Sequence, residues 1–328
     1  MLRSATFVKV YFLLLFTFTL LNFAAGQEIV EIKDNIKEHF FTFKQIEQLR
    51  DDTGILKFDE VRSPKYSNGF APSNKIIPLT TDLNSTNWFR IRIKNNEQAK
   101  TKFLLEFFDQ TIDHITAYIP QKDGTYAVQE LGDRLKFEER NLHHKNFEIL
   151  LSNDSDQVLT YYFKIRSSQS SAAIIVLRSV PWFISYALDE YFYFGIFYGM
   201  ILVFSFYNLM MFIAMRERQY LYYVLYMLSV ALFEMSSDGV AYQYLWPNSI
   251  GWNQVSFSFA LCAISVFALL FSKEFLIVRK IAPKLNKLIT IVVIVRIAFL
   301  VVSLLFFRDL LTYKFIEFVP LAVAFYTG

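Results

Sequence analysis

Four histidines are the residues of this 328-residue chain whose type most directly suggests metal chemistry. His39, His114 and the adjacent pair His143 and His144 have no cysteine neighbours. They also lack the H-x-x-x-H spacing that places two ligands on one face of a helix. Neighbouring residues on a strand point to opposite faces, so the adjacent pair cannot bind one ion together. The sequence therefore predicts no metal site and no cofactor.

Carboxylates are the other groups that could support catalysis. Glu106, Asp109 and Asp113 are close enough in sequence to suggest an acid and base pair, although charged residues at strand ends are usually solvated. The chain has 10 glycines and contains no G-x-S-x-G motif, no phosphate-binding glycine loop and no Walker-type lysine. We therefore expect no catalytic residue and no enzymatic activity in this chain.

Five residues are of the types that bind a carbohydrate. A Trp ring can stack on a sugar ring while carboxylate and guanidinium groups form hydrogen bonds with its hydroxyls. The predicted ligand-binding residues are Trp88, Asp109, Asp133, Arg134 and Arg140. In the alternative interpretation, Trp88 belongs to a core and the charged residues form a solvated face.

Three polar residues interrupt long apolar segments nearer the end of the chain. A charge exposed to lipid costs at least about 2.5 kcal/mol, so Glu234 and Arg296 are expected to face the interior of a helix bundle. We hypothesise that they pair between helices and lock one state of the bundle. Separate snorkelling or contact with water-filled crevices is the alternative. Asn208 is a candidate for a hydrogen bond between helices.

The charged residues divide the chain into two parts. Residues 27–180 carry 21 Lys and Arg and 22 Asp and Glu, whereas residues 181–328 carry only 10 and 8. The first part has a composition typical of a water-soluble domain, and the second is nearly free of charge. The net charge is +3, and the basic residues are not clustered on one face. We therefore expect no nucleic-acid partner.

Residues 1–26 have the features of a signal peptide. Arg3 and Lys9 precede an apolar run from Val10 to Leu21, and small residues follow up to Gly26. The run is shorter than the roughly 20 residues that span hydrocarbon, which argues against the alternative of a first membrane helix. We expect residues 27–180 to be exported. Cys262 is the single cysteine, so the exported part must rely on a packed core.

The exported part is predicted to be a β-sandwich. Apolar residues mostly alternate through it, and in residues 88–94 one face is apolar and the other cationic. Turn residues, such as Lys122, Asp123 and Gly124, separate seven or more short segments of this kind at roughly ten-residue spacing. This pattern is typical of an antiparallel sandwich.

Residues 181–328 are predicted to form an all-α transmembrane bundle. The expected spans are about 192–215, 221–240, 255–271, 288–307 and 315–328, the last incomplete. Basic residues lie between the first and second spans and between the third and fourth, whereas residues 241–254 contain no Lys or Arg. By the positive-inside rule, residues 241–254 and the sandwich face outward.

Several short segments of the chain are similar to a known receptor family. They are Tyr198-Gly199-Met200, Phe206-Tyr207-Asn208-Leu209, Arg216 to Tyr223, Tyr242 to Pro247, Trp88-Phe89-Arg90, Gly132-Asp133-Arg134 and Arg140 to Phe147. The chain resembles bacterial seven-transmembrane receptors with diverse intracellular signalling modules, and the exported part resembles their jelly-roll extracellular domain.

The resemblance implies a receptor in the inner membrane of a bacterium, with its first domain in the periplasm. That domain would sense a small molecule or carbohydrate and signal to a cytoplasmic module or partner, and a homodimer is a further expectation. Because seven spans and an output module should follow, the sequence is expected to be truncated within the fifth span. The Pro181 to Glu190 connector is short and apolar at its start, which predicts rigid coupling.

Two other functions remain open at this stage. A transporter subunit or membrane enzyme with an accessory sandwich would require polar residues or helix breaks in several spans, of which there are few. A eukaryotic surface receptor is suggested by two formal glycosylation motifs, Asn84-Ser85-Thr86 and Asn153-Asp154-Ser155. The missing output sequence would decide between these functions.

Overall fold

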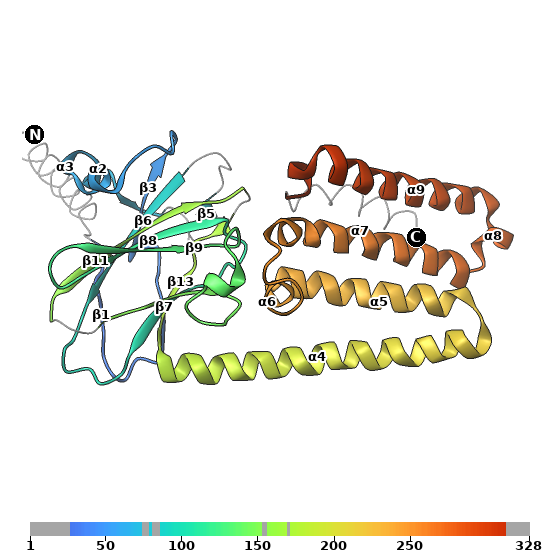
Figure 1. Ribbon diagram of the computed structural model, residues 1–328, viewed down its shortest axis with the longest axis horizontal. Helices are drawn as coiled ribbons and strands as arrows, with labels where there is room; N and C mark the ends of the chain where they lie inside the picture. Colours follow the sequence, from blue (N-terminus) through green and yellow to red (C-terminus); the bar gives the residue numbers. More distant parts are fainter. Residues whose placement is uncertain (1–26, 74–78, 81–85, 153–155, 169–170, 313–328) are drawn as a thin grey trace, which may run out of the picture.

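The computed structural model describes residues 27–73, 79–80, 86–152, 156–168 and 171–312. Figure 1 shows a β-domain beside a bundle of long helices, which confirms the predicted order of a β-sandwich followed by an all-α bundle. The predicted signal peptide (residues 1–26), the fifth span (315–328) and the glycosylation asparagines Asn84 and Asn153 lie outside the described residues.

Two largely antiparallel sheets form the sandwich. The first sheet has the order β4 (Ala71–Pro72), β3 (Ile46–Asp51), β6 (Thr86–Lys94), β11 (Val158–Arg166), β8 (His114–Pro120) and β9 (Tyr126–Leu131), and β1 (Val30–Glu31) joins β6 in parallel. The second sheet has the order β10 (Phe147–Leu150), β7 (Phe103–Phe107), β13 (Ile175–Ser179) and β2 (Glu38–Phe40). The short strands β5 (Leu79–Thr80) and β12 (Ser171–Ala172) pair with each other.

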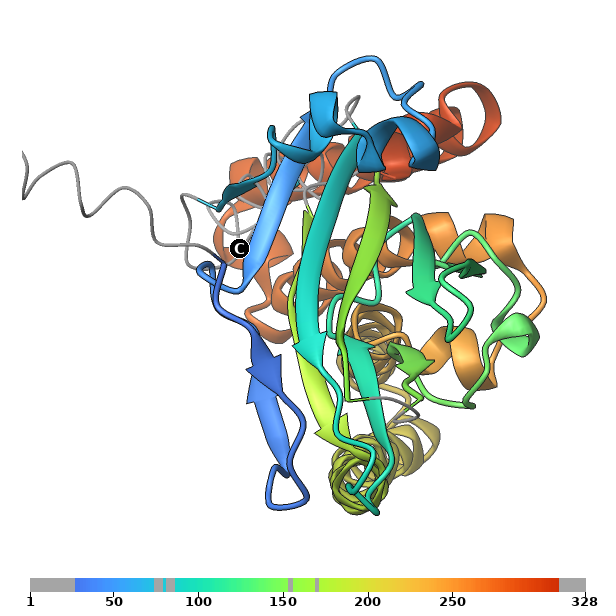
Figure 2. The same ribbon diagram turned by 90° about the vertical axis from the view of Figure 1, so that its left-hand side faces the viewer.

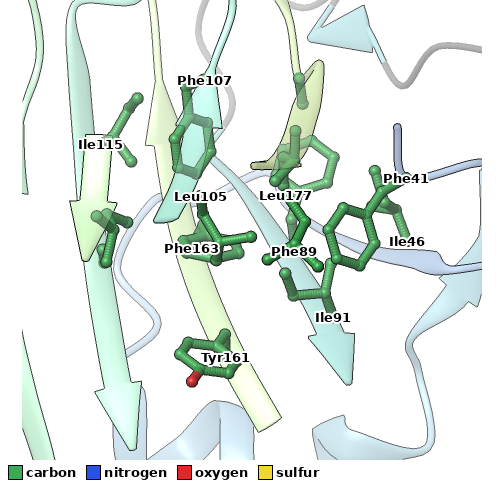
Figure 3. Close-up of a cluster of buried hydrophobic side chains, with 14 of the residues drawn as sticks. Phe41, Ile46, Phe89, Ile91, Leu105, Phe107, Ile115, Tyr161, Phe163 and Leu177 are labelled. Atoms are coloured by element: carbon green, nitrogen blue, oxygen red, sulfur yellow. The ribbon is translucent and has the colours of Figure 1, made fainter. Parts of the chain in front are cut away.

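The core lies between these sheets and follows the alternation in the sequence. Phe89 and Ile91 of β6 are fully buried and point into it. The rings of Phe107 and Phe163, one from each sheet, meet edge to face with centroids 5.0 Å apart (Figure 3). Because aromatic and branched side chains fill the space between the sheets, the exported part needs no disulfide to hold them together.

The outer face of β6 is cationic in sequence but is partly covered in the structure. The short helices α2 (Phe58–Arg62) and α3 (Pro64–Ser67) belong to the segment that covers it. Arg90 is 6% exposed, and its Nε donates to Glu47 Oε2 on β3 over 2.7 Å. The half of this face at Trp88 and Arg90 is therefore packed, whereas Arg92 is half-buried and Lys94 is exposed.

The helical part contains α4 (Val180–Met215), α5 (Arg218–Ser237), α6 (Val240–Tyr244), α7 (Ile250–Phe275), α8 (Val278–Ile281) and α9 (Pro283–Phe306), with the 3-10 helix η2 at Arg308–Thr312. Within the described chain, α4, α7 and α9 are long and apolar enough to cross a membrane. The helix α5, which corresponds to the predicted span 221–240, is not one of them. Since α5 contacts both α4 and α7, its tyrosine-rich sequence still has protein partners, and its crossing stays a prediction.

The helices are oriented as the loop charges predict. The turn between α4 and α5, which carries Arg216 and Arg218, lies at the end of the bundle far from the sandwich, as does α8 with Arg279 and Lys280 (Figure 1). The helix α6 lies at the sandwich end. Figure 2 views the molecule from that end and shows α4 almost along its axis behind the strands. The basic loops and the sandwich thus lie on opposite sides of the bundle.

Candidate functional site at the domain junction

A strand of the sandwich leads directly into the first long helix. The strand β13 ends at Ser179, α4 begins at Val180, and Pro181 stands in the first turn, where its missing N–H has no intrahelical partner to lose. The main-chain N–H of Val180 donates to the carbonyl of Lys102 over 2.8 Å, which ties the start of the helix to the sandwich. The predicted connector, Pro181 to Glu190, is therefore the first part of α4.

The helix α4 is longer than a crossing of the hydrocarbon core requires. Its 36 residues extend about 54 Å at 1.5 Å per residue, whereas the hydrocarbon core is about 30 Å thick. The first turns consequently remain beside the sandwich. Phe183 is 6% exposed and its ring meets the ring of His144 edge to face, with centroids 5.0 Å apart.

A group of buried charged residues lies where α4 meets the second sheet. We call it the junction cluster: Glu106, His144, Lys145, Glu148, Arg178 and Glu190. Arg178 Nε donates to Glu106 Oε2 over 2.5 Å, and His144 Nδ1 lies 2.7 Å from Glu148 Oε1. Lys145 Nζ lies 3.1 Å from Glu190 Oε1, which links the sandwich to α4. Burial raises the pKa of Glu148, although the hydrogen bond from His144 opposes this.

A second contact between the domains involves α6 and the loop after it. The hydroxyl of Tyr242 donates to the carbonyl of Leu135 over 2.7 Å, and Gln243 Nε2 donates to the carbonyl of His143 over 3.0 Å. The main-chain N–H of Phe137 donates to the carbonyl of Pro247 over 3.0 Å. The segment between β9 and β10 is thereby fastened to the outer loops of the bundle.

Arg140 and Asp133, two of the predicted ligand residues, lie at this second contact. The Arg140 guanidinium lies 4.4 Å from the ring centroid of Phe137 and 4.5 Å from that of Phe147. Its NH1 donates to the carbonyl oxygens of residues 144–146, and burial lowers the pKa of Arg140 to about 10. Asp133 is 7% exposed, and burial together with the charge of Asp113 raises its pKa well above the usual value.

A small polar cavity separates Asp133 from the bundle. Its volume is about 40 Å³, and Asp133, Arg140, Tyr242 and Gln254 are among the residues that line it. This is room for about one or two water molecules and is too small for a sugar ring.

The other predicted ligand residues have structural partners. Trp88 is fully buried, with its ring 5.6 Å from that of Tyr118. Asp109 accepts hydrogen bonds from the N–H groups of residues 111 and 172, and Arg134 Nε lies 2.9 Å from Asp113 Oδ2. The five residues do not form one exposed surface, and their contact with a ligand stays a prediction.

Two of the three polar residues predicted within the membrane part have hydrogen-bond partners in the described chain. Arg296 is 3% exposed and its Nε donates to Ser265 Oγ of α7 over 3.1 Å. Asn208 donates to the carbonyl of Phe204 in its own helix. Among the residues that the structure describes, no ion pair joins Glu234 on α5 to Arg296 on α9, and α7 lies between these helices in Figure 1.

Sequence reasoning did not identify the junction cluster, although a signal for it exists. The apolar strands β7, β10 and β13 each contain one charged residue, namely Glu106, Glu148 and Arg178. Ligand atoms of Glu106, His144 and Glu148 lie within 4.8 Å of one another, so these residues could hold a metal ion. The search for histidine pairs missed them because two of the three groups are carboxylates on different strands.

The sandwich also has a larger cavity at the end away from the bundle. It has a volume of about 540 Å³ and is lined by polar residues that include Asn95, Gln121, Asp123 and Gln157. Ligand pockets usually have volumes of about 300 to 1,000 Å³. This cavity is thus large enough for a small molecule.

Comparison with protein families gives two adjacent matches. Residues 44–179 match the family described as 7TMR-DISM extracellular 2, and residues 190–328 match the family described as 7TM diverse intracellular signalling. None of the curated proteins compared with the chain is similar to it. The first match covers most of the sandwich and the second covers the bundle from Glu190 onward. The chain therefore belongs to the 7TMR-DISM family, the seven-transmembrane receptors with diverse intracellular signalling modules.

Proposed function

We propose that this chain is the sensing and membrane part of a signalling receptor in the inner membrane of a bacterium. The exported sandwich binds a small-molecule ligand, such as a carbohydrate, and the bundle passes the change to a cytoplasmic signalling module or partner. The observation that carries this proposal is the direct continuation of β13 into α4. Because no flexible residue separates them, a shift of β13 also shifts the outer end of α4.

In this proposal, two contacts between the sandwich and the bundle transmit the change, and we call these two contacts the relay. The junction cluster connects the sandwich to α4, and the contact of α6 with residues 135–146 connects it to the loop between α5 and α7. A ligand can shift the equilibrium between two arrangements only by its different affinity for them. Ligand binding must therefore change the geometry of at least one of these two contacts.

The polar cavity of about 540 Å³ supports a ligand site at the membrane-distal end of the sandwich. Its amide and carboxylate side chains match the hydrogen-bonding groups of a polyhydroxyl ligand. Asp133 and Arg140, which the sequence suggested as ligand residues, lie at the bundle end. We assign them to the relay rather than to this cavity.

The test uses the full chain in lipid nanodiscs and a library of neutral and acidic oligosaccharides. One spin label is placed at Ile55, which is 75% exposed and does not line the cavity, and the other at Arg216, in a Cys262→Ser background. We expect at least one oligosaccharide to bind and to shift the distance distribution between the labels. Binding without any shift would contradict the relay, and a library without a binder would exclude carbohydrate as the ligand class.

A further inference from the structure

Two glutamates of the junction cluster lie directly opposite each other on neighbouring strands. Glu106 of β7 is paired in register with Glu148 of β10, and the two residues are 0% and 3% exposed. Like charges at opposed positions of a sheet destabilise it, and buried carboxylates require a positive partner. Glu106 has Arg178 as its partner, so the question is which cation accompanies Glu148.

His144 completes a set of metal-ligand types around the two carboxylates. Its Nδ1 lies 2.7 Å from Glu148 Oε1, and one ligand atom from each of the three residues lies within 4.8 Å of the others. Imidazole nitrogen and carboxylate oxygen are ligands of Zn²⁺, at about 2.0 to 2.2 Å. Ligand atoms around a tetrahedral ion of this size are about 3.3 Å apart, so His144 Nδ1 and Glu148 Oε1 would separate by about 0.6 Å from their hydrogen-bonded distance to admit the ion.

The surroundings of His144 match those of a metal-binding histidine. Such a histidine usually donates its second ring N–H to a carboxylate, which fixes the orientation of the ring. His144 Nε2 faces Glu190 Oε2 of α4 at 3.6 Å, and neither atom has a hydrogen bond within the described part of the chain. The rings of Phe183 and Tyr191 meet the imidazole edge to face and hold it in place.

Glu106 is also held in position, by groups outside the set of three. Asn146 Nδ2 donates to Glu106 Oε1 over 2.6 Å, and Arg178 Nε donates to Oε2 over 2.5 Å. Asn146 is itself fully buried, and its Oδ1 has no hydrogen bond among the described residues. Several other charged groups surround these residues, namely the carboxylates of Glu38 and Glu190 and the cations of Arg140, Lys145 and Arg178.

We propose that Glu106, His144 and Glu148 bind one divalent transition-metal ion of the zinc type at the junction, with Glu190 as the partner of the second ring nitrogen. All three ligands come from the sandwich, and Glu190 comes from α4. The ion therefore fixes the face of His144 on which α4 rests. Binding of the ion does not depend on the proposed receptor function, whereas its influence on the relay does.

The experiment measures zinc on the tag-free full chain in detergent, first stripped with a chelator and then titrated with ZnCl₂ in a calorimeter. We expect a stoichiometry close to one. His144→Gln and Glu148→Gln should weaken binding by about 100-fold or more, and Glu190→Gln by about 10- to 100-fold, because it removes only the partner of a ligand. Replacing zinc with Co²⁺ gives an absorption spectrum that reports the nitrogen and oxygen ligands directly.

His39→Gln is the matched control. This histidine lies on β2 of the same sheet and contacts Gln45 rather than a carboxylate. It should leave zinc affinity unchanged. Equal affinity in the His144 and His39 variants, or no zinc bound by the wild-type chain, would overturn the proposal and leave His144 as an ion-pair partner of Glu148. A variant that does not fold is replaced by Glu190→Gln, which keeps all three ligands.

Discussion

At the residue scale, the junction uses charged side chains as packing elements. The Arg140 guanidinium lies between two aromatic rings and donates to main-chain carbonyl groups, which compensates for the water it loses on burial. A planar, forked cation can do both, whereas the compact ammonium of Lys cannot. The residue type that suggested a sugar contact therefore has a structural explanation at this position.

We expect Arg140→Lys to lower the free energy of unfolding by about 2 kcal/mol, since it loses charged hydrogen bonds and ring stacking. Denaturation of the chain in detergent, followed by tryptophan fluorescence, measures this. Arg134→Lys is the control: Arg134 has a side chain that is 41% exposed and pairs with Asp113, so its replacement should cost less than about 1 kcal/mol. Similar losses in both variants would contradict the packing role of Arg140.

The raised pKa of Asp133 predicts that the stability of the folded chain depends on pH. Because burial raises its pKa in the folded chain, the folded state holds the proton more tightly than the unfolded state. Stability should therefore fall as pH rises from about 3.9, the pKa of an exposed Asp, through the raised folded value. Asp133→Asn imitates the protonated form, so this variant should melt at a higher temperature than the wild type at pH 7.

Asp123 is the control for this prediction, because its contribution to stability should depend on pH in the opposite direction. Asp123 accepts hydrogen bonds from Thr125 at an exposed turn, and these lower its pKa. Its contribution to stability should be present at neutral pH and lost as pH falls. Melting curves between pH 2 and 8 distinguish the two, because the contribution of Asp123 is lost only below about pH 4. A lower melting temperature for Asp133→Asn at pH 7 would mean that Arg140 holds the carboxylate in its charged form.

At the scale of elements, the turn from α5 into α6 determines how closely the bundle approaches the sandwich. Gly239 has φ +76°, a conformation that side chains rarely adopt. A Cβ added there would lie 3.2 Å from the Gln110 side chain and 3.5 Å from the Lys145 carbonyl oxygen. Glycine is needed here for both its backbone conformation and its small size.

Gly239→Ala should destabilise the chain by strain of about 1 to 2 kcal/mol and should also loosen the contact of α6 with the sandwich. Gly124→Ala provides the control, because Gly124 has φ +80° but nothing within 4 Å of an added Cβ. Both variants carry the strain, and only the first crowds the junction. We expect faster hydrogen exchange at residues 135–146 in Gly239→Ala alone. Equal exchange in both would refute a crowded junction.

At the scale of the whole molecule, the sandwich and the bundle are joined where the strand β13 continues directly into the helix α4. The strand β13 lies between β7 and β2 in its sheet, so motion of the second sheet reaches α4 through a covalent and hydrogen-bonded path. The basic loops lie at the far end of the helices, which the positive-inside rule assigns to the cytoplasm. The sandwich and these basic loops thus lie at opposite ends of the long helices.

Inserting Gly-Ser-Gly-Ser between Ser179 and Val180 should uncouple the two domains. We expect a broader distance distribution between spin labels at Ile55 and Arg216, because the helix no longer continues the strand. The same insertion after Gly124, at the distal hairpin, lengthens the chain without touching the junction and should leave the distribution narrow. An unchanged distribution in the first variant would show that the noncovalent contacts alone hold the domains together.

Much of the fold could be predicted because its signals are local. The alternation in residues 88–94 identified β6 and its inward face, and Phe89 and Ile91 are buried there. The partial cover of the cationic face was not predicted, because α2 and α3 come from residues 58–67 and nothing in the strand itself reveals them. The five ligand residues were chosen by type alone, which does not predict where their side chains lie.

The sequence by itself determined the two domains, most of their secondary structure and the family, since periodicity and hydropathy act over short stretches or add up along the chain. Only the tertiary structure decided the partners of the charged residues. Glu106 is 40 residues from Asn146 and 72 from Arg178. Strand register and the docking of α4 bring these groups together, and both depend on the packing of the whole chain.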